Sequence, residues 1–441
     1  MGMVVKNNMS AISTLNTLNK NSNALTKSLQ KVSSGMKINS AADDASGYAI
    51  SERMRVQIRG LDQANANTQS GNSMMKVAEG AVSSTVDILK TLKEKVINAA
   101  NDTNTDSDRQ TIQKELDQSI DQIDDNANVT FNGKYLVDGS HNNKVTATKT
   151  SLTNESMSSA TAGGSALTAL KNRNGEDLNI HSTDRVTVSY VQQGKTYTTT
   201  FQVGSKTLSQ VVASVSSAKN GQTQGKAVLT LSSTTAYIGQ SSSTNSVYTA
   251  DNGNAITLTA ATAGTNGQVS GFTISITDNT GAINKSANAV LDNFSESIRA
   301  QNNSEDNALV LQVGTKANQA IKVGLTDMRS NALGLKGTDG QTLNVSTQAK
   351  ANAAINVLDN ALQKALDQQT TIGSVESRLE YTSANLTTAS ENVQSSESTI
   401  RDANMAKEMT EYTKNNVLMQ AAQSMLAQAN QSSSSVLSLL Q

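Results

Sequence analysis

Few side chains in this sequence are spaced in a way that would support catalysis or metal binding. The chain of 441 residues has two histidines, His141 and His181, and no cysteine. Neither histidine belongs to the HExxH motif of zinc peptidases. Asp43 and Asp44 could share a cation, but acidic residues just before a helix usually cap its first turn. Residues 221–226 (GQTQGK) have too few residues between their glycines for a phosphate-binding loop. We therefore expect no enzyme activity, no cofactor and no metal site.

Both ends of the chain instead carry an apolar residue at every seventh position. The N-terminal series runs through Met54, Leu61, Met75, Val82, Leu89 and Val96 and is broken at Thr68. The C-terminal series consists of Leu358, Ala365, Ile372, Leu379, Leu386, Val393 and Ile400. Heptad repeats of this length predict long helices that wind around partner helices. We expect the seam of this bundle to contain Leu61, Met75, Val82, Leu89, Val96, Leu379, Leu386, Val393 and Ile400.

The heptad segments lie within a larger set of predicted helices. Amphipathic spacing and capping residues place these helices at about 4–36, 44–100, 109–127, 346–402 and 405–431. Short hairpins are expected beside them. Asn132-Gly133 suits the two-residue turn of a hairpin at 130–135, and the alternating segments 308–313 and 320–325 predict a second strand pair.

The centre of the chain has a different pattern. Ser, Thr, Asn and Gly predominate between about 140 and 305, and alternating polar and apolar residues predict strands at 186–190, 197–201, 227–231, 255–258 and 272–276. Short helices are expected near 207–217 and 286–300. The expected fold class is therefore α+β and multidomain: a long antiparallel α-helical coiled coil or bundle from both termini with short β-hairpins, plus a β-rich central domain.

Composition argues against several kinds of partner. The net charge is -1, so no long-range field would attract the chain to nucleic acid. The sequence has no run of 18 apolar residues, so we expect no membrane insertion. Aromatic residues make up 3% of the chain, which disfavours a central domain that binds sugars by stacking. The richest candidates for such stacking are Tyr190, Tyr197, Phe201 and Tyr237.

Motifs in the N-terminal part resemble those of a known family. Residues 28–50 (SLQKVSSGMKINSAADDASGYAI) are similar to the signature of bacterial flagellins, with Val32 where the family has leucine and Lys37 where it has arginine. Residues 79–81 (EGA) and 131–133 (FNG) match the same family in the same order.

The C-terminal part resembles the same family. Residues 426–431 (LAQANQ) and 436–440 (VLSLL) are similar to the flagellin C-terminus, with Ser433 where the family usually has proline. The resemblance covers about 1–140 and 300–441. The resemblance does not extend to the centre.

The resemblance implies a layered architecture and a structural role. Residues 1–43 and 405–441 would be terminal helices in the inner layer of a filament. Residues 44–140 and 305–404 would form a helical bundle with hairpins, and 141–304 a variable, surface-exposed β-rich domain. The chain would be the structural subunit that polymerises into the bacterial flagellar filament for motility. The alternatives are a hook–filament junction protein, or a filament subunit whose central domain is an adhesin.

The resemblance also implies location and partners. The subunit would be extracellular, in the bacterial flagellum, and exported without a cleaved signal peptide. The first ten residues have no apolar core of signal-peptide length. Its partners would be other copies of itself in a helical homopolymer, the flagellar export chaperone and export apparatus, and the hook-associated and cap proteins.

The terminal helices have too few apolar side chains to repay the entropy of ordering them as an isolated pair. We therefore expect the termini to fold on assembly, when neighbouring subunits supply the missing contacts. The expected subunit-packing residues are Leu15, Leu18, Leu25, Leu29, Val32, Met409, Leu418, Met425, Leu426, Val436, Leu437, Leu439 and Leu440.

The resemblance raises the question of recognition by Toll-like receptor 5. Flagellins detected by this receptor resemble L-Q-R-V-R-E-L on the second helix, where this chain has residues 89–95 (LKTLKEK). Thr91 replaces the first arginine and Lys95 the last leucine, whereas Glu115 matches an acidic position on the third helix. Because other side chains cannot reproduce the planar, bidentate contacts of arginine, we expect weak or absent activation.

Overall fold

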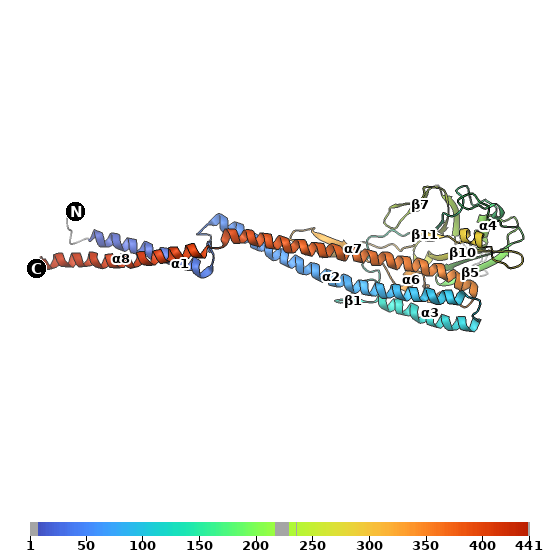
Figure 1. Ribbon diagram of the computed structural model, residues 1–441, viewed down its shortest axis with the longest axis horizontal. Coiled ribbons are helices and arrows are strands. Elements are labelled where there is room, and N and C mark those ends of the chain that lie inside the picture. The colour runs from blue at the N-terminus through green and yellow to red at the C-terminus, as the bar shows by residue number, and fades with distance from the viewer. Residues whose placement is uncertain (1–7, 217–228, 235, 440–441) are drawn as a thin grey trace. The chain divides into compact units, whose positions relative to one another are not determined.

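A computed structural model describes residues 8–216, 229–234 and 236–439 (Figure 1). The chain divides into two compact units. Unit 1 comprises Met1–Thr68, Gln312–Gln319 and Tyr381–Gln441, and unit 2 comprises Gln69–Leu311 and Ala320–Glu380. The two long helices, α2 (Ala45–Ala100) and α7 (Gln348–Arg401), contribute residues to both units.

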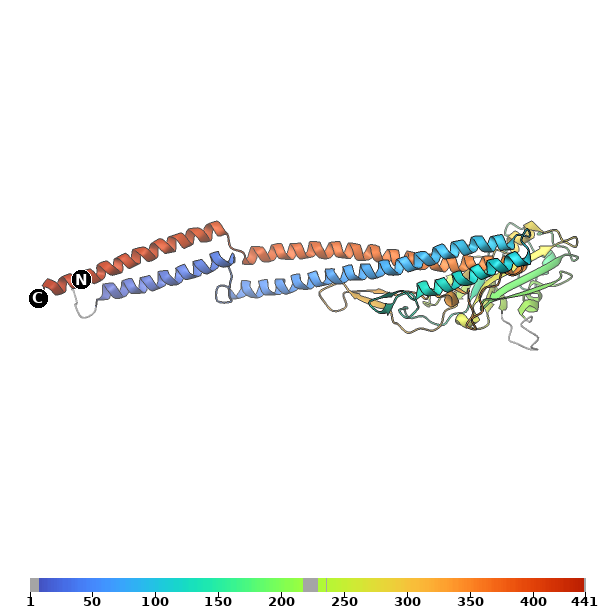
Figure 2. The same cartoon turned by 90° about the horizontal axis from the view of Figure 1, so that it is seen from below.

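One part of unit 1 is a pair of helices from the two ends of the chain. Helices α1 (Met9–Ser34) and α8 (Met405–Leu439) lie side by side in Figure 1 and in Figure 2. The side chain of Asn8 caps α1 by accepting a hydrogen bond from the N–H of Ala11 at 3.1 Å. Gly35 ends the helix at a φ of 70°, a left-handed conformation that glycine adopts without steric cost. Both helices were expected from the sequence.

Unit 2 contains a bundle built from the remaining parts of α2 and α7. Helix α3 (Asp106–Ala127) lies along α2, and the short helix α6 (Ser330–Leu333) contacts α3. Strands β1 (Thr130–Phe131) and β2 (Lys134–Tyr135) form the expected hairpin. Strands β12 (Leu309–Gln312) and β13 (Ala320–Val323) form the second expected pair.

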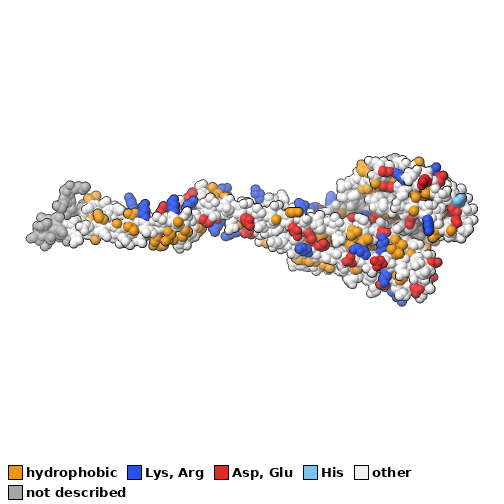
Figure 3. All heavy atoms as spheres, viewed as in Figure 1, with side chains coloured by type: hydrophobic (Ala, Val, Ile, Leu, Met, Phe, Trp, Pro, Cys, Tyr) orange, Lys and Arg blue, Asp and Glu red, His pale blue; other side chains and the backbone are white. Residues whose placement is uncertain are grey.

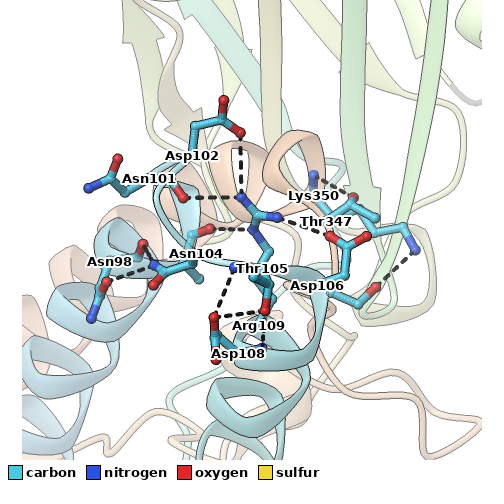
Figure 4. Close-up of polar contacts among 12 residues, drawn as sticks. Asn98, Asn101, Asp102, Asn104, Thr105, Asp106, Asp108, Arg109, Thr347 and Lys350 are labelled. Carbon is cyan, nitrogen blue, oxygen red and sulfur yellow. Dashed lines mark hydrogen bonds and ion pairs between the residues drawn. The ribbon is translucent and has the colours of Figure 1, made fainter.

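The turn between α2 and α3 is held by Arg109 (Figure 4). Its side chain is 6% exposed, and Nη1 lies 3.0 Å from a carboxylate oxygen of Asp106. Nε donates a hydrogen bond to the carbonyl of Ala99 at 2.9 Å, and Nη2 donates to the carbonyl of Asn101 at 3.1 Å. One guanidinium therefore satisfies carbonyls at the end of α2 while it pairs with the first residue of α3.

The start of α3 differs from the expected position. The sequence predicted a helix from about 109, but the helix begins at Asp106. The side chain of Thr105 accepts a hydrogen bond from the N–H of Asp108, and the Asp108 carboxylate accepts one from the N–H of Thr105. This reciprocal capping box starts the helix inside a segment whose polar composition suggested a break.

The β-rich region, residues 151–298, belongs to unit 2. Its described residues include a three-stranded sheet in the order β10-β4-β5 and a four-stranded sheet in the order β11-β3-β9-β6. All pairs are antiparallel. The strands are β3 (Ser151–Asn154), β4 (Arg185–Gln192), β5 (Lys195–Gln202), β6 (Leu229–Thr234), β9 (Ala255–Ala260), β10 (Val269–Thr277) and β11 (Ser295–Ile298). Strands β7 (Tyr237–Gln240) and β8 (Ser246–Tyr248) form a separate hairpin, and the region also contains helices α4 (Leu208–Ser216) and α5 (Lys285–Leu291).

One apolar core joins the two larger sheets of this region. Alternate residues of β4, such as Val186 and Val188, pack with Leu258 of β9 and with Phe272 and Ile274 of β10. Because side chains alternate between the faces of a strand, the period-two pattern in the sequence predicted the strands that contain these residues.

The expected α+β fold class is confirmed, although several details of the central region differ from the predictions. The helix predicted at 286–300 is wrong in its second half, because α5 ends at Leu291 and 295–298 is strand β11. Glu296 is opposite Leu152 of β3, so sheet pairing overrides the helix-like spacing there. Strands β3, β7 and β8 were not predicted. Residues 227–228 of the strand expected at 227–231 lie outside the described residues.

Candidate assembly surface

Helices α1 and α8 are joined by several polar contacts. The side chain of Asn21 donates a hydrogen bond to the carbonyl of Leu418 at 3.2 Å, and that of Asn415 donates to the hydroxyl of Ser28 at 2.9 Å. Lys31 lies 4.0 Å from Glu408. These contacts set the helices antiparallel.

The apolar side chains of this pair are largely uncovered. Of the expected subunit-packing residues, Leu18, Leu25, Val32 and Leu426 are half-buried, and Leu15, Leu29, Met409, Leu418 and Met425 are 41–61% exposed. The side chains of Val436, Leu437 and Leu439 are not among the described residues, and neither is Leu440.

More apolar side chains on the same helices are exposed, namely Met9, Ile12, Met405 and Val417. Figure 3 shows hydrophobic side chains gathered along this pair. We call the exposed apolar residues of α1 and α8 together the terminal apolar surface. Contiguous apolar surface of this kind marks a site of protein contact.

The long helices provide the contrast. In unit 2, Met75, Val82, Leu89, Val96 and Leu379 are fully buried. In unit 1, Leu61 and Leu386 are buried and pack with the half-buried Val393, and Ile400 is also half-buried. Thr68, which breaks the heptad series, is buried with its hydroxyl donating to the carbonyl of Ala64 at 2.8 Å. Similar apolar spacing therefore gives covered side chains in α2 and α7 but uncovered ones in α1 and α8.

The two helix breaks in unit 1 are joined to each other. The N–H of Lys37 donates to the carbonyl of Arg401 at 2.7 Å, and the N–H of Ala403 donates to the carbonyl of Gly35 at 2.9 Å. The side chain of Arg401 is 6% exposed and lies 2.6 Å from a carboxylate oxygen of Glu52. Its guanidinium also lies 5.3 Å from the centre of the Tyr48 ring, within the range of a cation–π contact. Sequence reasoning missed Arg401, because nothing local indicates that it is buried.

Asp43 and Asp44 bind backbone groups. Asp44 accepts hydrogen bonds from the N–H groups of Ser46 and Gly47 at 3.0 Å each, at the start of α2. Asp43 accepts one from the N–H of Ser40 at 3.1 Å. Among the residues with described positions, no cluster of three or more His, Cys, Asp or Glu side chains is arranged to hold a metal ion. Likewise, none of the described helices has the length and apolar character needed to span a membrane.

The positions expected to govern receptor recognition lie on α2 and α3. Lys95 on α2 pairs with Glu115 on α3 at 3.0 Å. The hydroxyl of Thr91 donates to the carbonyl of Asp87 at 3.0 Å, within its own helix. The acidic side chain that matches the receptor-binding pattern is therefore paired within the chain.

Comparison with known protein families gives matches at both ends of the chain. Residues 5–142 match the bacterial flagellin N-terminal helical region, and residues 355–440 match the bacterial flagellin C-terminal helical region. The chain is 34% identical to a flagellin of Clostridium tyrobutyricum over 97% of this chain and 99% of that protein. It is 30% identical to a flagellin of Bacillus subtilis over 99% of this chain and 100% of that protein. It is 29% identical to the flagellar filament 33 kDa core protein of Treponema phagedenis, over 99% and 100% of the two chains.

Proposed function

This chain belongs to the bacterial flagellin family, and on that premise we propose that it is the structural subunit of a flagellar filament. The filament is extracellular and serves motility. The terminal apolar surface carries this proposal, because side chains such as Leu29 and Met425 are 50% and 61% exposed in the single chain. Neighbouring subunits in a filament would cover them.

The geometry of the proposed contact suits an open polymer. Helices α1 and α8 both present apolar residues, so one subunit can be covered by several others. Contacts between different surfaces of identical subunits generate a helix when the rotation does not close a ring. We infer that the termini gain their full stability on assembly, because the buried apolar area that the pair lacks comes from neighbours.

The proposed layers follow the predicted boundaries. Residues 1–43 and 405–441 form the inner layer, residues 44–140 and 305–404 the surrounding bundle, and residues 141–304 the displayed domain. The uncovered side chains of α1 and α8 and the buried heptad positions of α2 and α7 support this assignment.

Family membership supports the remaining partners. We infer contacts with a flagellar export chaperone, the export apparatus, and hook-associated and cap proteins.

The alternative of a hook–filament junction protein has less support, since flagellins match this chain over nearly its whole length. The adhesin alternative is also weaker, because Tyr190 is buried and stacked on the half-buried Tyr197. Phe201 is half-buried as well, which leaves Tyr237 as the exposed residue among the four candidates for sugar stacking.

Polymerisation of purified full-length chain tests the proposal. Sulfate salts strengthen apolar burial, so the wild-type chain should form filaments in them that are visible by electron microscopy and recovered by sedimentation. Leu29→Gln together with Met425→Gln should greatly reduce the sedimented fraction while leaving monomer unfolding unchanged, because both side chains are exposed in the monomer.

The matched control is Ile283→Gln, which changes a side chain 63% exposed in the β-rich region. This control should polymerise like the wild type. A wild-type chain that forms no filaments would refute the proposed function. A double variant that polymerises normally would refute the role of the terminal apolar surface.

A further inference from the structure

Strand β10 lies at the edge of the β10-β4-β5 sheet. One side of β10 pairs with β4, and the other side pairs with no strand of this sheet. The free edge of a strand offers unpaired backbone groups to any other strand. In this chain α7 contacts that edge through side chains of Asn356 and Asn360. Both elements at this contact belong to unit 2.

The two asparagines bond to alternate carbonyls of the strand. Nδ2 of Asn356 donates to the carbonyl of Phe272 at 3.3 Å, and Nδ2 of Asn360 donates to the carbonyl of Ser270 at 2.8 Å. Residues four apart on a helix are separated by about 6 Å along its axis. Residues two apart on a strand are separated by about 6.6 Å. Because these spacings nearly match, both hydrogen bonds can form at once.

Gly271, between the two carbonyl-bearing residues, allows the close approach. A Cβ atom at this position would lie 2.9 Å from Cγ2 of Val357 and 3.3 Å from the carbonyl oxygen of Ala353. The register of β10 against β4 also shifts between Val269 and Gly271. Such a bulge redirects the backbone of an edge strand. The strand is thus adapted to a helix at this edge.

A third contact lies farther along α7. Nη1 of Arg299, just after β11, is 2.8 Å from a carboxylate oxygen of Asp367. Asp367 follows Asn360 by two helical turns, so both residues lie on one face of the helix. The chain therefore contacts α7 at two separated places, one in the β-rich region and one directly after it.

We propose that Asn356 and Asn360 are positioning residues that dock the β-rich region on α7, where a further strand would otherwise pair with β10. They fix the direction in which the region is held relative to the bundle of unit 2. This inference concerns the single chain and goes beyond filament formation, so it does not depend on polymerisation.

Distance measurements between two spin labels test the docking. The sequence has no cysteine, so Lys114→Cys on α3 and Ala289→Cys on α5, both exposed, would carry the only labels. In the otherwise unchanged monomer, double electron–electron resonance should give one narrow distance distribution. Asn356→Ala with Asn360→Ala should broaden it. A distribution that stays narrow in the double variant would overturn the proposal.

Asn352→Ala is the matched control, because Asn352 is an exposed asparagine one turn earlier on α7. This control should leave the distribution narrow, and broadening there would also contradict the proposal. Alanine is a better helix former than asparagine, so weakening of α7 cannot explain an effect of the double variant. If circular dichroism shows that the double variant is unfolded, the distance distribution of the single variant Asn360→Ala is the deciding measurement. It should broaden the distribution, and an unchanged width would overturn the proposal.

Discussion

Arg401 and Glu52 form an ion pair of 2.6 Å that joins the last residue of α7 to the first turns of α2. The arginine is buried and the glutamate is partly exposed. A buried guanidinium needs such a partner, since its desolvation is otherwise unfavourable. This pair lies beside the two joined helix breaks of unit 1. It therefore stabilises the chain where α2 and α7 meet the terminal helices.

We predict that Arg401→Met destabilises the monomer by about 1.5–3 kcal/mol, the range for hydrogen bonds to charged groups. Urea unfolding of the monomer, followed by circular dichroism, measures this change. Arg53→Met is the control, because Arg53 is exposed on the same stretch of α2. Equal stability of the two variants would show that the Arg401 pair contributes nothing.

We predict that a leucine-to-alanine substitution destabilises the monomer strongly in the pair of α2 and α7 but hardly at all in the pair of α1 and α8. Leu89→Ala removes a fully buried side chain and should destabilise the monomer by about 2–5 kcal/mol. Leu29→Ala changes a side chain that is 50% exposed and should alter monomer stability by no more than about 0.5 kcal/mol. Urea unfolding measures both values, and sedimentation of assembled filaments should show a defect for Leu29→Ala. A large loss of monomer stability in Leu29→Ala would contradict the exposed position of this residue.

We predict that Glu296 makes the stability of unit 2 depend on pH. Its side chain is 7% exposed, and burial raises the pKa of this carboxyl to about 7 from its usual 4.5, although the nearby Arg299 and Lys364 act in the opposite direction. Between these values, the unfolded chain loses the Glu296 proton while the folded chain keeps it. The contribution is therefore fully present below about pH 4.5 and is lost as the pH rises through about 7.

The difference between the two pKa values corresponds to about 3 kcal/mol. Urea unfolding at pH 5 and pH 7.5 measures most of this difference. Glu296→Gln should weaken the pH dependence across this interval, because glutamine does not titrate. Asp292, whose pKa burial also raises to about 7, still titrates there. The exposed Glu305 provides the control variant Glu305→Gln, which should keep the wild-type dependence. Identical pH profiles for wild type and Glu296→Gln would refute the prediction.

We predict weak or absent activation of Toll-like receptor 5 by the wild-type chain. Thr91 lacks the bidentate contacts of an arginine, and Lys95 already pairs with Glu115 at 3.0 Å. Thr91→Arg with Lys95→Leu restores both motif positions and frees Glu115, so this variant should gain activity in a cell reporter assay. Lys114→Leu, an exposed position on α3, serves as the control. Strong activation by the wild type would show that these positions do not limit recognition.

The sequence alone determined features that depend on local spacing. The heptad series predicted the long helices, because a seven-residue apolar period suits only helices that pack along one another. Asn132-Gly133 predicted a hairpin turn, and both residues have positive φ values, 50° and 75°, as such a turn requires. The alternation in Val186–Tyr190 likewise predicted a strand, which is β4 in the structure. The N- and C-terminal motifs indicated the family, and with it the structural role.

Only the tertiary structure decided which side chains are buried and which residues distant in sequence come into contact. Similar apolar spacing is buried at Leu89 and exposed at Leu29, because burial depends on which other segments lie alongside. The segment 295–298 became a strand through its pairing with β3. Arg401 was buried by its contacts with Glu52 and Tyr48. Asn356 and Asn360 appear in the sequence as ordinary polar helix residues. Their hydrogen bonds to β10 exist because folding brings α7 to the free edge of a strand more than 80 residues away.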